Sequence, residues 1–369
     1  MQSGEHVYRV GIAGCGTIFP AYMEGLARFP HIEVLRCADI IPERALRGHS
    51  EFGIERYGGP EELYADGDVE IILNITPPNT HIEVSTRALQ AGKHLYSEKT
   101  ITTDLADANR LLALAAERGL TLGSAPDTFL GSWGATSRAV VDSGLLGEIA
   151  AATAFVRHNR VEHWHPDPRF LFEPGAGPTL DRGPYYLTAL VNLLGPVAAV
   201  AGMARMGART RAVTAPNRLV DEVHVTIPSH STAVLRFESG VLATIIFSSD
   251  IWATELPNIE LYGSRGTLAL PHPNWFDGDV RFKTSADRDA EWRVVPAVWP
   301  VGSLRGEGIA DMIASFGGRA QRTGPELARH VLEVLLAVER SSDSSGFIEI
   351  ESTCERPDWG LLPEAVVSA

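Results

Sequence analysis

The fold is decided by residues 11–19, which read Gly-Ile-Ala-Gly-Cys-Gly-Thr-Ile-Phe. An apolar run precedes this stretch, and a helical pattern follows it. Gly14 allows a tight turn after a strand, and Gly16 lets the backbone approach a pyrophosphate at the N-terminus of the helix. Phe19 stands where a third small residue is usual, so a turn with only a structural role is the alternative. The stretch indicates a strand–turn–helix unit that can bind a dinucleotide.

The acid that such a unit needs for the ribose is Asp39. It ends the next apolar run and lies 23 residues after Gly16, close to the usual spacing of about 20. A carboxylate there binds ribose hydroxyls and repels a 2′-phosphate, and neither Ile40 nor Ile41 is basic. The pattern therefore predicts NAD as the cofactor, with NADP disfavoured. The alternative is that Asp39 only caps the helix that begins at Pro42.

The chain changes character near residue 127. Before it, short apolar runs alternate with helical patterns, which is typical of a parallel sheet covered on both faces. After it come longer β-branched strands with hairpin-like spacing and a few helices, which indicates a mainly antiparallel sheet with helices on one face. We therefore predict an α/β chain with a dinucleotide-binding domain over residues 1–126 and a substrate-binding and oligomerisation α+β domain over residues 127–369.

The composition of the chain limits the kinds of partner that it can bind. The chain has 369 residues, enough for two domains, and its formal net charge of −14 disfavours nucleic acid and anionic membranes as partners. It has three cysteines without metal-ligand spacing, and no apolar stretch long enough for a signal core or a membrane span. We expect a cytoplasmic protein.

Two loops follow predicted strands of the first domain. One begins at Thr76 and the other contains Lys99. Open α/β sheets bind their ligands at the carboxyl ends of the strands, so both loops are candidates for the site. A lysine in a cleft can act as an acid or an electrostatic anchor, although a lysine after a strand is usually just solvated.

The second half contributes two candidate segments. Asp181 and Tyr185 are four residues apart, so on a helix they share a face and can form a proton relay, unless Asp181 is a helix cap and Tyr185 a core residue. The loop of residues 157–166 offers Trp164 to a sugar ring and histidine side chains to hydroxyls. A structural loop, or a metal site built from its three histidines including His158, are the alternatives; the metal site lacks convincing partners.

In this order, the glycine turn, Asp39, the segment of residues 91–99 and the Asp-x-Gly-x-Tyr helix resemble the glucose–fructose oxidoreductase/inositol dehydrogenase family (Gfo/Idh/MocA). The resemblance covers nearly the whole chain. It implies a Rossmann domain followed by an open-faced sheet that often forms oligomer contacts. The family lysine falls on Lys99 and the second-domain aspartate on Asp181, while Tyr185 stands where many members have histidine. Thr100 replaces the proline that follows the lysine, which leaves the positioning of Lys99 open.

The sequence thus predicts an NAD-dependent oxidoreductase that moves hydride between nicotinamide and a secondary hydroxyl of a sugar, glycoside or cyclitol. Tyr185 or Lys99 would remove the hydroxyl proton, and Asp181 would orient the substrate. The alternatives are a glycoside hydrolase or lyase that acts by transient oxidation, and a non-catalytic sensor. We expect a homodimer or homotetramer and no metal. The expected cofactor contacts are Gly14, Gly16, Thr17, Ile18, Asp39, Thr76, Pro77, Asn79, His81, Glu98 and Lys99, and the expected substrate contacts are Arg157, His163, Trp164, His165 and Tyr186.

Overall fold

The computed structural model describes residues 6–157, 161–363 and 365. Two compact units divide the chain. The first contains the described residues of Met1–Leu130 together with Ser303–Arg329, and the second contains those of Gly131–Gly302 and His330–Ala369.

The first unit is built on a parallel sheet of six strands in the order β3-β2-β1-β4-β5-β6. Every residue of β4 and most of β1 are buried, as expected for strands with helices on both faces. The parallel sheet predicted from the alternating pattern is confirmed. The strands are β1 (Tyr8–Ala13), β2 (Ile32–Ala38), β3 (Arg56–Gly58), β4 (Ile71–Asn74), β5 (His94–Ser97) and β6 (Leu122–Ser124).

Helices connect these strands. Pro stands in the first turn of α1, α2 and α3, where its missing N–H costs no hydrogen bond. Asp104 caps α5 by accepting from the backbone N–H groups of Ala106 and Asp107. The helices are α1 (Phe19–Leu26), α2 (Pro42–Phe52), α3 (Pro60–Ala65), α4 (His81–Gln90) and α5 (Leu105–Glu117), with 3₁₀ turns η1 (Pro78–Thr80) and η2 (Thr128–Leu130).

A late segment of the chain completes the first unit. We expected Ser303–Arg329 in the second domain, but it packs with the first, because α8 (Glu307–Ser315) contributes Ile309 and Met312 to the core beside β1 and β4. The fully buried carboxylate of Asp127 accepts from the backbone N–H groups that open α8, those of Gly306 and Gly308. Asp127 also forms an ion pair with Arg305 at 3.1 Å, so one side chain fastens the segment.

The second unit is built on a nine-stranded sheet in the order β16-β15-β14-β13-β7-β12-β11-β8-β17. Its strand pairs are antiparallel except for β12 with β7, which confirms the mostly antiparallel sheet. A separate hairpin pairs β9 with β10. The strands are β7 (Ile149–Arg157), β8 (Val197–Arg205), β9 (Thr210–Ala212), β10 (Glu222–His224), β11 (His230–Phe237), β12 (Leu242–Ser248), β13 (Ile259–Gly263), β14 (Gly266–Leu270), β15 (Arg281–Thr284), β16 (Arg293–Val294) and β17 (Ile348–Glu349).

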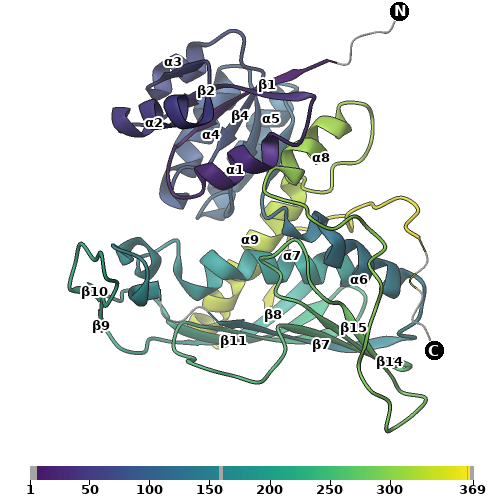
Figure 1. Ribbon diagram of the computed structural model, residues 1–369. Helices are drawn as coiled ribbons and strands as arrows, with labels where there is room; N and C mark the ends of the chain where they lie inside the picture. The colour runs from purple at the N-terminus through teal and green to yellow at the C-terminus, as the bar shows by residue number, and fades with distance from the viewer. Residues whose placement is uncertain (1–5, 158–160, 364, 366–369) are drawn as a thin grey trace, which may run out of the picture. The chain divides into compact units, whose positions relative to one another are not determined.

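Helices cover one face of this sheet, as Figure 1 shows for α6 and α7. Each residue of α7 is buried, so this helix forms the centre of the unit. The opposite face carries the exposed side chains of Met203, Val234 and Leu242. The helical elements are α6 (Ser132–Asp142), η3 (Val161–His163), η4 (Arg169–Phe172), the π-helical turn η5 (Pro178–Arg182), α7 (Gly183–Leu194) and α9 (Pro325–Ser344), whose first residues belong to the first unit.

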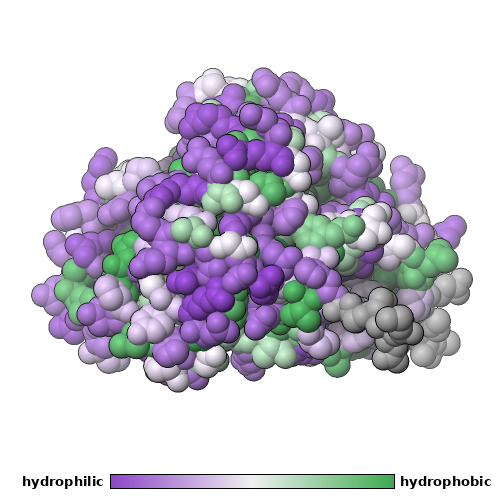
Figure 2. Space-filling view, turned by 90° about the horizontal axis from the view of Figure 1, so that it is seen from above, coloured by the Kyte–Doolittle hydropathy of each residue, from purple (hydrophilic) through white to green (hydrophobic). Residues whose placement is uncertain are grey.

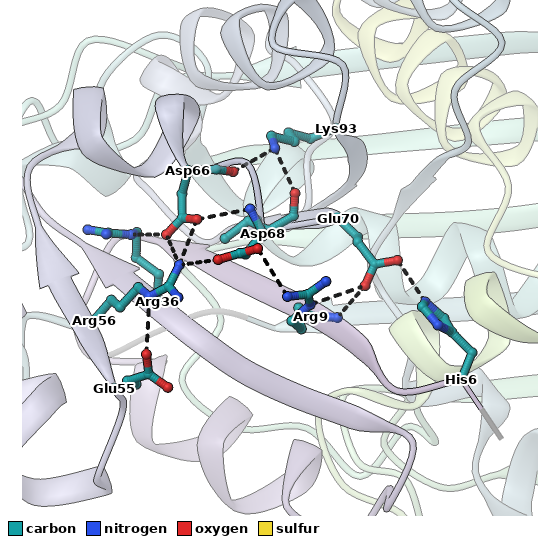
Figure 3. A network of polar contacts seen from close by, with 10 residues as sticks. His6, Arg9, Arg36, Glu55, Arg56, Asp66, Asp68, Glu70 and Lys93 are labelled. Atoms are coloured by element: carbon teal, nitrogen blue, oxygen red, sulfur yellow. Dashed lines mark hydrogen bonds and ion pairs between the residues drawn. The ribbon is translucent and has the colours of Figure 1, made fainter. Parts of the chain in front are cut away.

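A charged network ties loops of the first unit together (Figure 3). Asp66, buried to 5% side-chain exposure, binds the guanidinium groups of Arg36 at 2.7 Å and Arg56 at 2.9 Å. The amine of Lys93, just before β5, donates to the carbonyl oxygens of Asp66 and Val69. The network joins residues before β4 and β5, so it lies away from the carboxyl ends of these strands.

The surface seen in Figure 2 is mostly hydrophilic, and its apolar residues lie in small separate groups. Among the helices of the described residues, none is long and apolar enough to cross a membrane.

Candidate functional site

In the glycine turn after β1, Gly16 has open space beside it, whereas Gly14 is packed closely against the protein. Gly14 has a φ of +96°, and a Cβ there would lie 3.1 Å from the carbonyl oxygen of Ile75. A Cβ on Gly16 would meet nothing within 4 Å, so the turn is open at Gly16. Thr17 is exposed and Ile18 half-buried just before α1 begins. This arrangement fits a pyrophosphate held by backbone N–H groups.

Asp39 is fixed beside that turn. One of its carboxylate oxygens accepts from the N–H of Cys15 at 2.8 Å, and the other accepts from the N–H of Ile41 at 2.8 Å. The side chain does not cap α2, whose N-cap is Ile41 and lacks a side-chain cap. A carboxylate at the end of β2, tied to the glycine turn, has the position that ribose recognition requires.

The two loops predicted from the sequence are joined by His81. Its buried ring places Nδ1 2.6 Å from the carbonyl oxygen of Thr100 and Nε2 2.8 Å from that of Thr76. Burial lowers the pKa of His81, and the two carbonyls oppose this effect. Pro77 directly precedes η1 and Asn79 lies within it, so both residues belong to the loop between Thr76 and His81.

Lys99 follows β5 and is half-buried. Glu98 accepts from the N–H of Lys99 at 3.0 Å through one oxygen and from the hydroxyl of Tyr22 at 2.8 Å through the other. Burial, reinforced by Glu98, raises the pKa of Tyr22 well above its usual value, so Tyr22 stays a donor. The peptide bond between Lys99 and Thr100 is cis. Glu98 thus fixes the backbone from which the amine projects.

In the second unit, Asp181 and Tyr185 stand on either side of the junction between η5 and α7. The chain already turns as a π-helix from Pro178 and continues as the α-helix α7 from Gly183. Tyr185 is 4% exposed. The N-cap of α7 is Arg182, without a side-chain cap, so Asp181 does not cap this helix; it pairs with Arg182 at 3.2 Å.

Side chains from two distant segments of the chain contact Tyr186. Its hydroxyl donates to Oδ1 of Asn258 at 3.3 Å, and its ring centroid lies 6.0 Å from that of His272. His272 in turn lies edge-on to Trp275. Burial raises the pKa of Tyr186 to about 12, against the opposing effect of Arg157 and Arg182.

The loop after β7 forms a small aromatic cluster. Trp164 is 56% exposed and packs edge-on to His165, which also contacts Phe170. Nδ1 of His163 lies 2.6 Å from the hydroxyl of Thr214. His158 lies outside the described residues. Among the residues described, no three His, Cys, Asp or Glu side chains group as metal ligands.

The expected residues divide between the two units. The first unit brings together the expected cofactor contacts around the ends of β1, β2, β4 and β5, and the second holds Asp181, Tyr185, Tyr186 and Arg157. Sequence reasoning missed Tyr22, Asn258 and His272, which carry no local signal. Their proximity to the expected residues comes from long-range packing.

The fold and these residues define the class of two-domain oxidoreductases that bind NAD. Residues 8–125 match the model of the oxidoreductase family with an NAD-binding Rossmann fold, and residues 135–269 match the GFO/IDH/MocA C-terminal domain. The chain is 32% identical over 265 residues to the dTDP-3,4-didehydro-2,6-dideoxy-alpha-D-glucose 3-reductase of Actinomadura kijaniata, a match that covers 70% of this chain and 73% of that protein. The chain belongs to the GFO/IDH/MocA family of oxidoreductases.

Solved structures share the fold. Levoglucosan dehydrogenase in complex with NADH and L-sorbose superimposes with a TM-score of 0.80 at 17% identity, covering 94% of this chain and 100% of that one. The WlbA dehydrogenase from Bordetella pertussis, in complex with NADH and UDP-GlcNAcA, gives a TM-score of 0.73 at 19% identity, with coverages of 93% and 99%. At these identities the likeness concerns the fold alone.

Proposed function

We propose that this protein transfers hydride between nicotinamide and a secondary hydroxyl, or the matching ketone, of a sugar, glycoside or cyclitol. The observation that carries the proposal is that the chain holds each of the three side chains that the proton transfer would use. Lys99 follows a strand of the NAD-binding domain, and Asp181 and Tyr185 stand at the start of α7. A non-catalytic sensor would have no use for all three.

The proposed chemistry follows from these side chains. NAD supplies the acceptor of the hydride that leaves the carbinol carbon, or its reduced form supplies the donor for the reverse reaction. The phenol of Tyr185 exchanges the hydroxyl proton, and the ammonium group of Lys99 stabilises the oxyanion that forms. Asp181 accepts a hydrogen bond from another substrate hydroxyl and so orients the ring.

Relatives support a carbohydrate substrate. The relative from Actinomadura is named as a 3-reductase of a dTDP-linked didehydro-dideoxy-glucose. Trp164 and the histidines His163 and His165 offer an apolar ring face and polar atoms, the two kinds of contact that a sugar makes.

The test follows NADH absorbance with purified protein, NAD and a panel of sugars, cyclitols and glycosides, with products identified by mass. A keto-sugar panel with NADH covers the reverse direction. Turnover of one substrate class supports the proposal. Glycoside cleavage without NADH accumulation would replace it with transient oxidation. Bound NAD without any turnover across both panels would replace it with the sensor.

We also propose a cytoplasmic homodimer or homotetramer. The free cysteines Cys15 and Cys37 are buried, which suits a reducing compartment. The exposed apolar side chains of Met203, Val234 and Leu242 on the sheet face opposite α7 suit contact with a second copy. Light scattering coupled to size-exclusion chromatography would measure the mass, and a monomeric mass at micromolar concentration would contradict the assembly.

A further inference from the structure

A small hydrophobic core in the second unit is built outside the nine-stranded sheet. It joins the loop of residues 161–172, which carries His163, Trp164 and His165, to the hairpin of β9 and β10. In Figure 1 this hairpin lies at the opposite end of the unit from β14 and β15. The buried side chains of this core are Val161, Leu171, Phe172, Val213, Ala215, Val223 and Val225.

Backbone hydrogen bonds attach the loop to the hairpin and to the residues beside it. Near the start of the loop, the carbonyl oxygen of Glu162 accepts from the N–H of Thr214 at 2.8 Å. At its end, the carbonyl oxygen of Phe172 accepts from the N–H of Thr226 at 3.1 Å. Because both ends of the loop are bonded in this way, its conformation depends on that of the hairpin.

One side chain of the hairpin connects the loop to the large sheet. Nη1 of Arg211, on β9, donates to Oε1 of Glu162 at 2.8 Å. The same nitrogen donates to the carbonyl oxygen of Ser249 at 3.1 Å, and Nη2 binds the carboxylate of Asp250. Ser249 and Asp250 directly follow β12. The guanidinium carbon also lies 5.4 Å from the centroid of the Phe172 ring, so Arg211 contacts both ends of the loop and the end of β12.

These contacts need the shape of an arginine. The side chains of Arg211 and Glu162 are only 13% and 9% exposed, so their ion pair is largely shielded from water. Asp250 accepts in turn from the hydroxyl of Ser229 at 2.7 Å, which fixes the second carboxylate. A planar guanidinium can serve two carboxylates and a carbonyl oxygen at once, whereas the single amine of a lysine would lose part of this set.

The hairpin also holds one of the expected substrate contacts directly. Nδ1 of His163 lies 2.6 Å from the hydroxyl of Thr214. The ring of Trp252 packs edge-on against that of His163, with 5.9 Å between the centroids. Because one ring nitrogen is bonded to the hairpin, a substrate hydroxyl would meet the other nitrogen, Nε2.

We propose that Arg211 and Thr214 are positioning residues for the sugar substrate. Thr214 orients the ring of His163, and Arg211 fastens the loop that carries this ring to the end of β12. The inference rests on the proposed function, since it takes the loop as a substrate contact. The side chains assigned to proton transfer lie on other elements, so the two positioning residues should affect the binding of the substrate more than the chemical step.

The first test is Thr214→Val, which removes the hydroxyl and keeps the shape of an exposed side chain. Kinetics are measured at saturating NAD or NADH with the panel member that has the highest kcat/KM. We expect KM to rise about fivefold or more with kcat within about twofold, because the lost contact is made equally in the ground and transition states. Thr210→Val, exposed on the same hairpin, is the matched control. A wild-type KM in Thr214→Val would overturn the role of Thr214.

The second test is Arg211→Gln combined with Glu162→Gln, because removing Arg211 alone would leave a buried carboxylate without its cation. Hydrogen exchange of the backbone amides in residues 161–172 should become about tenfold faster or more, with β7 and β12 unchanged. KM should rise about tenfold with kcat within about threefold, and Arg211→Lys alone should show a smaller rise. Unchanged exchange in the loop, or faster exchange with a wild-type KM, would overturn the role of Arg211.

Hydrogen exchange does not depend on turnover, so the two proposals can fail separately. If exchange in the loop is faster in the double variant but no sugar of either panel reacts with the wild type, the anchoring of the loop stands and the proposed function fails. If the wild type turns over a sugar and neither Thr214→Val nor the double variant raises KM, the proposed function stands and the positioning roles fail.

Discussion

Nδ1 of His81 lies 2.6 Å from the carbonyl oxygen of Thr100, the residue after Lys99. Nε2 lies 2.8 Å from the carbonyl oxygen of Thr76, so one buried ring joins the two loops at the strand ends. Carbonyl oxygens only accept, and a neutral imidazole donates from one nitrogen only. The ring can therefore donate to only one of the two carbonyls at a time, and because it lies against the backbone of both loops we assign it a positioning role for Lys99.

Replacing His81 with Leu should lower kcat about 10- to 100-fold, because a small displacement of Lys99 is costly in the transition state. The affinity for NAD, measured by quenching of protein fluorescence, should change less. His81→Gln retains one donor and should recover part of kcat. A folded His81→Leu protein with unchanged kcat would contradict the positioning role.

Lys99→Ala should reduce turnover about 100-fold or more, since the oxyanion loses the cation that we propose stabilises it. NAD binding should persist, because Glu98 accepts from the backbone N–H of Lys99, which the substitution leaves in place. Stopped-flow measurement of the hydride step would separate chemistry from product release. Lys283→Ala on β15 is the matched control, and comparable rates in the two variants would remove Lys99 from the mechanism.

Alanine substitutions at two glycines should have opposite effects, one on stability and the other on NAD binding. A Cβ on Gly25 would lie 1.7 Å from the carbonyl oxygen of Arg305, so Gly25→Ala should displace the segment before α8 and destabilise the protein by about 2 kcal/mol. A Cβ on Gly16 would meet no protein atom within 4 Å, so Gly16→Ala should keep its thermal midpoint yet bind NAD at least about tenfold more weakly. Differential scanning calorimetry and NAD titration together test the pair, and normal NAD binding by Gly16→Ala would argue against the cradle.

The parts of the fold that the sequence predicts are those with local signals. The bounds of β2, α2 and β5 agree with the apolar runs and the proline at Pro42, because burial on both faces produces a continuous apolar pattern. In contrast β8, which reads Val-Ala-Ala-Val-Ala-Gly-Met-Ala-Arg, has few strand-forming residues. It is a strand because β11 pairs along it and β17 pairs with part of it.

In the candidate site, too, the residues that the sequence predicts are those with a local signal. Asp39 and Lys99 are recognisable because Asp39 directly follows β2, Lys99 comes two residues after β5, and each belongs to a spaced motif. His272 lies in the loop after β14 and has no motif, and only the packing of Tyr186 against it brings it beside an expected substrate contact. Asp127 likewise resembles any loop aspartate until α8 returns from a distant part of the chain to meet it.

Asp39 should determine the choice of cofactor. Its carboxylate, held by the N–H groups of Cys15 and Ile41, would meet the 2′-phosphate of NADP with like charge. Asp39→Ser combined with Ile40→Arg should therefore shift the ratio of kcat/KM values from NAD towards NADP by about 100-fold or more. Ile40→Arg alone is the control, because it adds the cation and keeps the repulsion. A double variant that still prefers NAD by the wild-type ratio would show that another group makes the choice.

Because of Asp66, the stability of the first unit should fall in acid. Burial alone would raise the pKa of Asp66, but hydrogen bonds from Arg36, the N–H of Asp68 and Arg56 outweigh it and bring the pKa to about 2, below the usual 3.8. A carboxyl whose pKa is depressed by folding stabilises the protein above its unfolded pKa and loses that contribution as the pH falls through the folded one. Allowing for solvent around Arg56, we expect Asp66→Asn to lower the free energy of unfolding by about 1–2 kcal/mol at pH 7.

The difference between wild type and Asp66→Asn should shrink as the pH is lowered from about 4 to about 2, because the wild-type carboxyl is then protonated as well. Urea unfolding at each pH measures it. Glu55→Gln removes an exposed partner of the same Arg56 and should change stability by no more than about 0.5 kcal/mol at any pH. A difference for Asp66→Asn that stays constant down to pH 2 would mean that the lost contacts are those of shape and hydrogen bonding, and that the charge of Asp66 contributes nothing to holding Arg36 and Arg56.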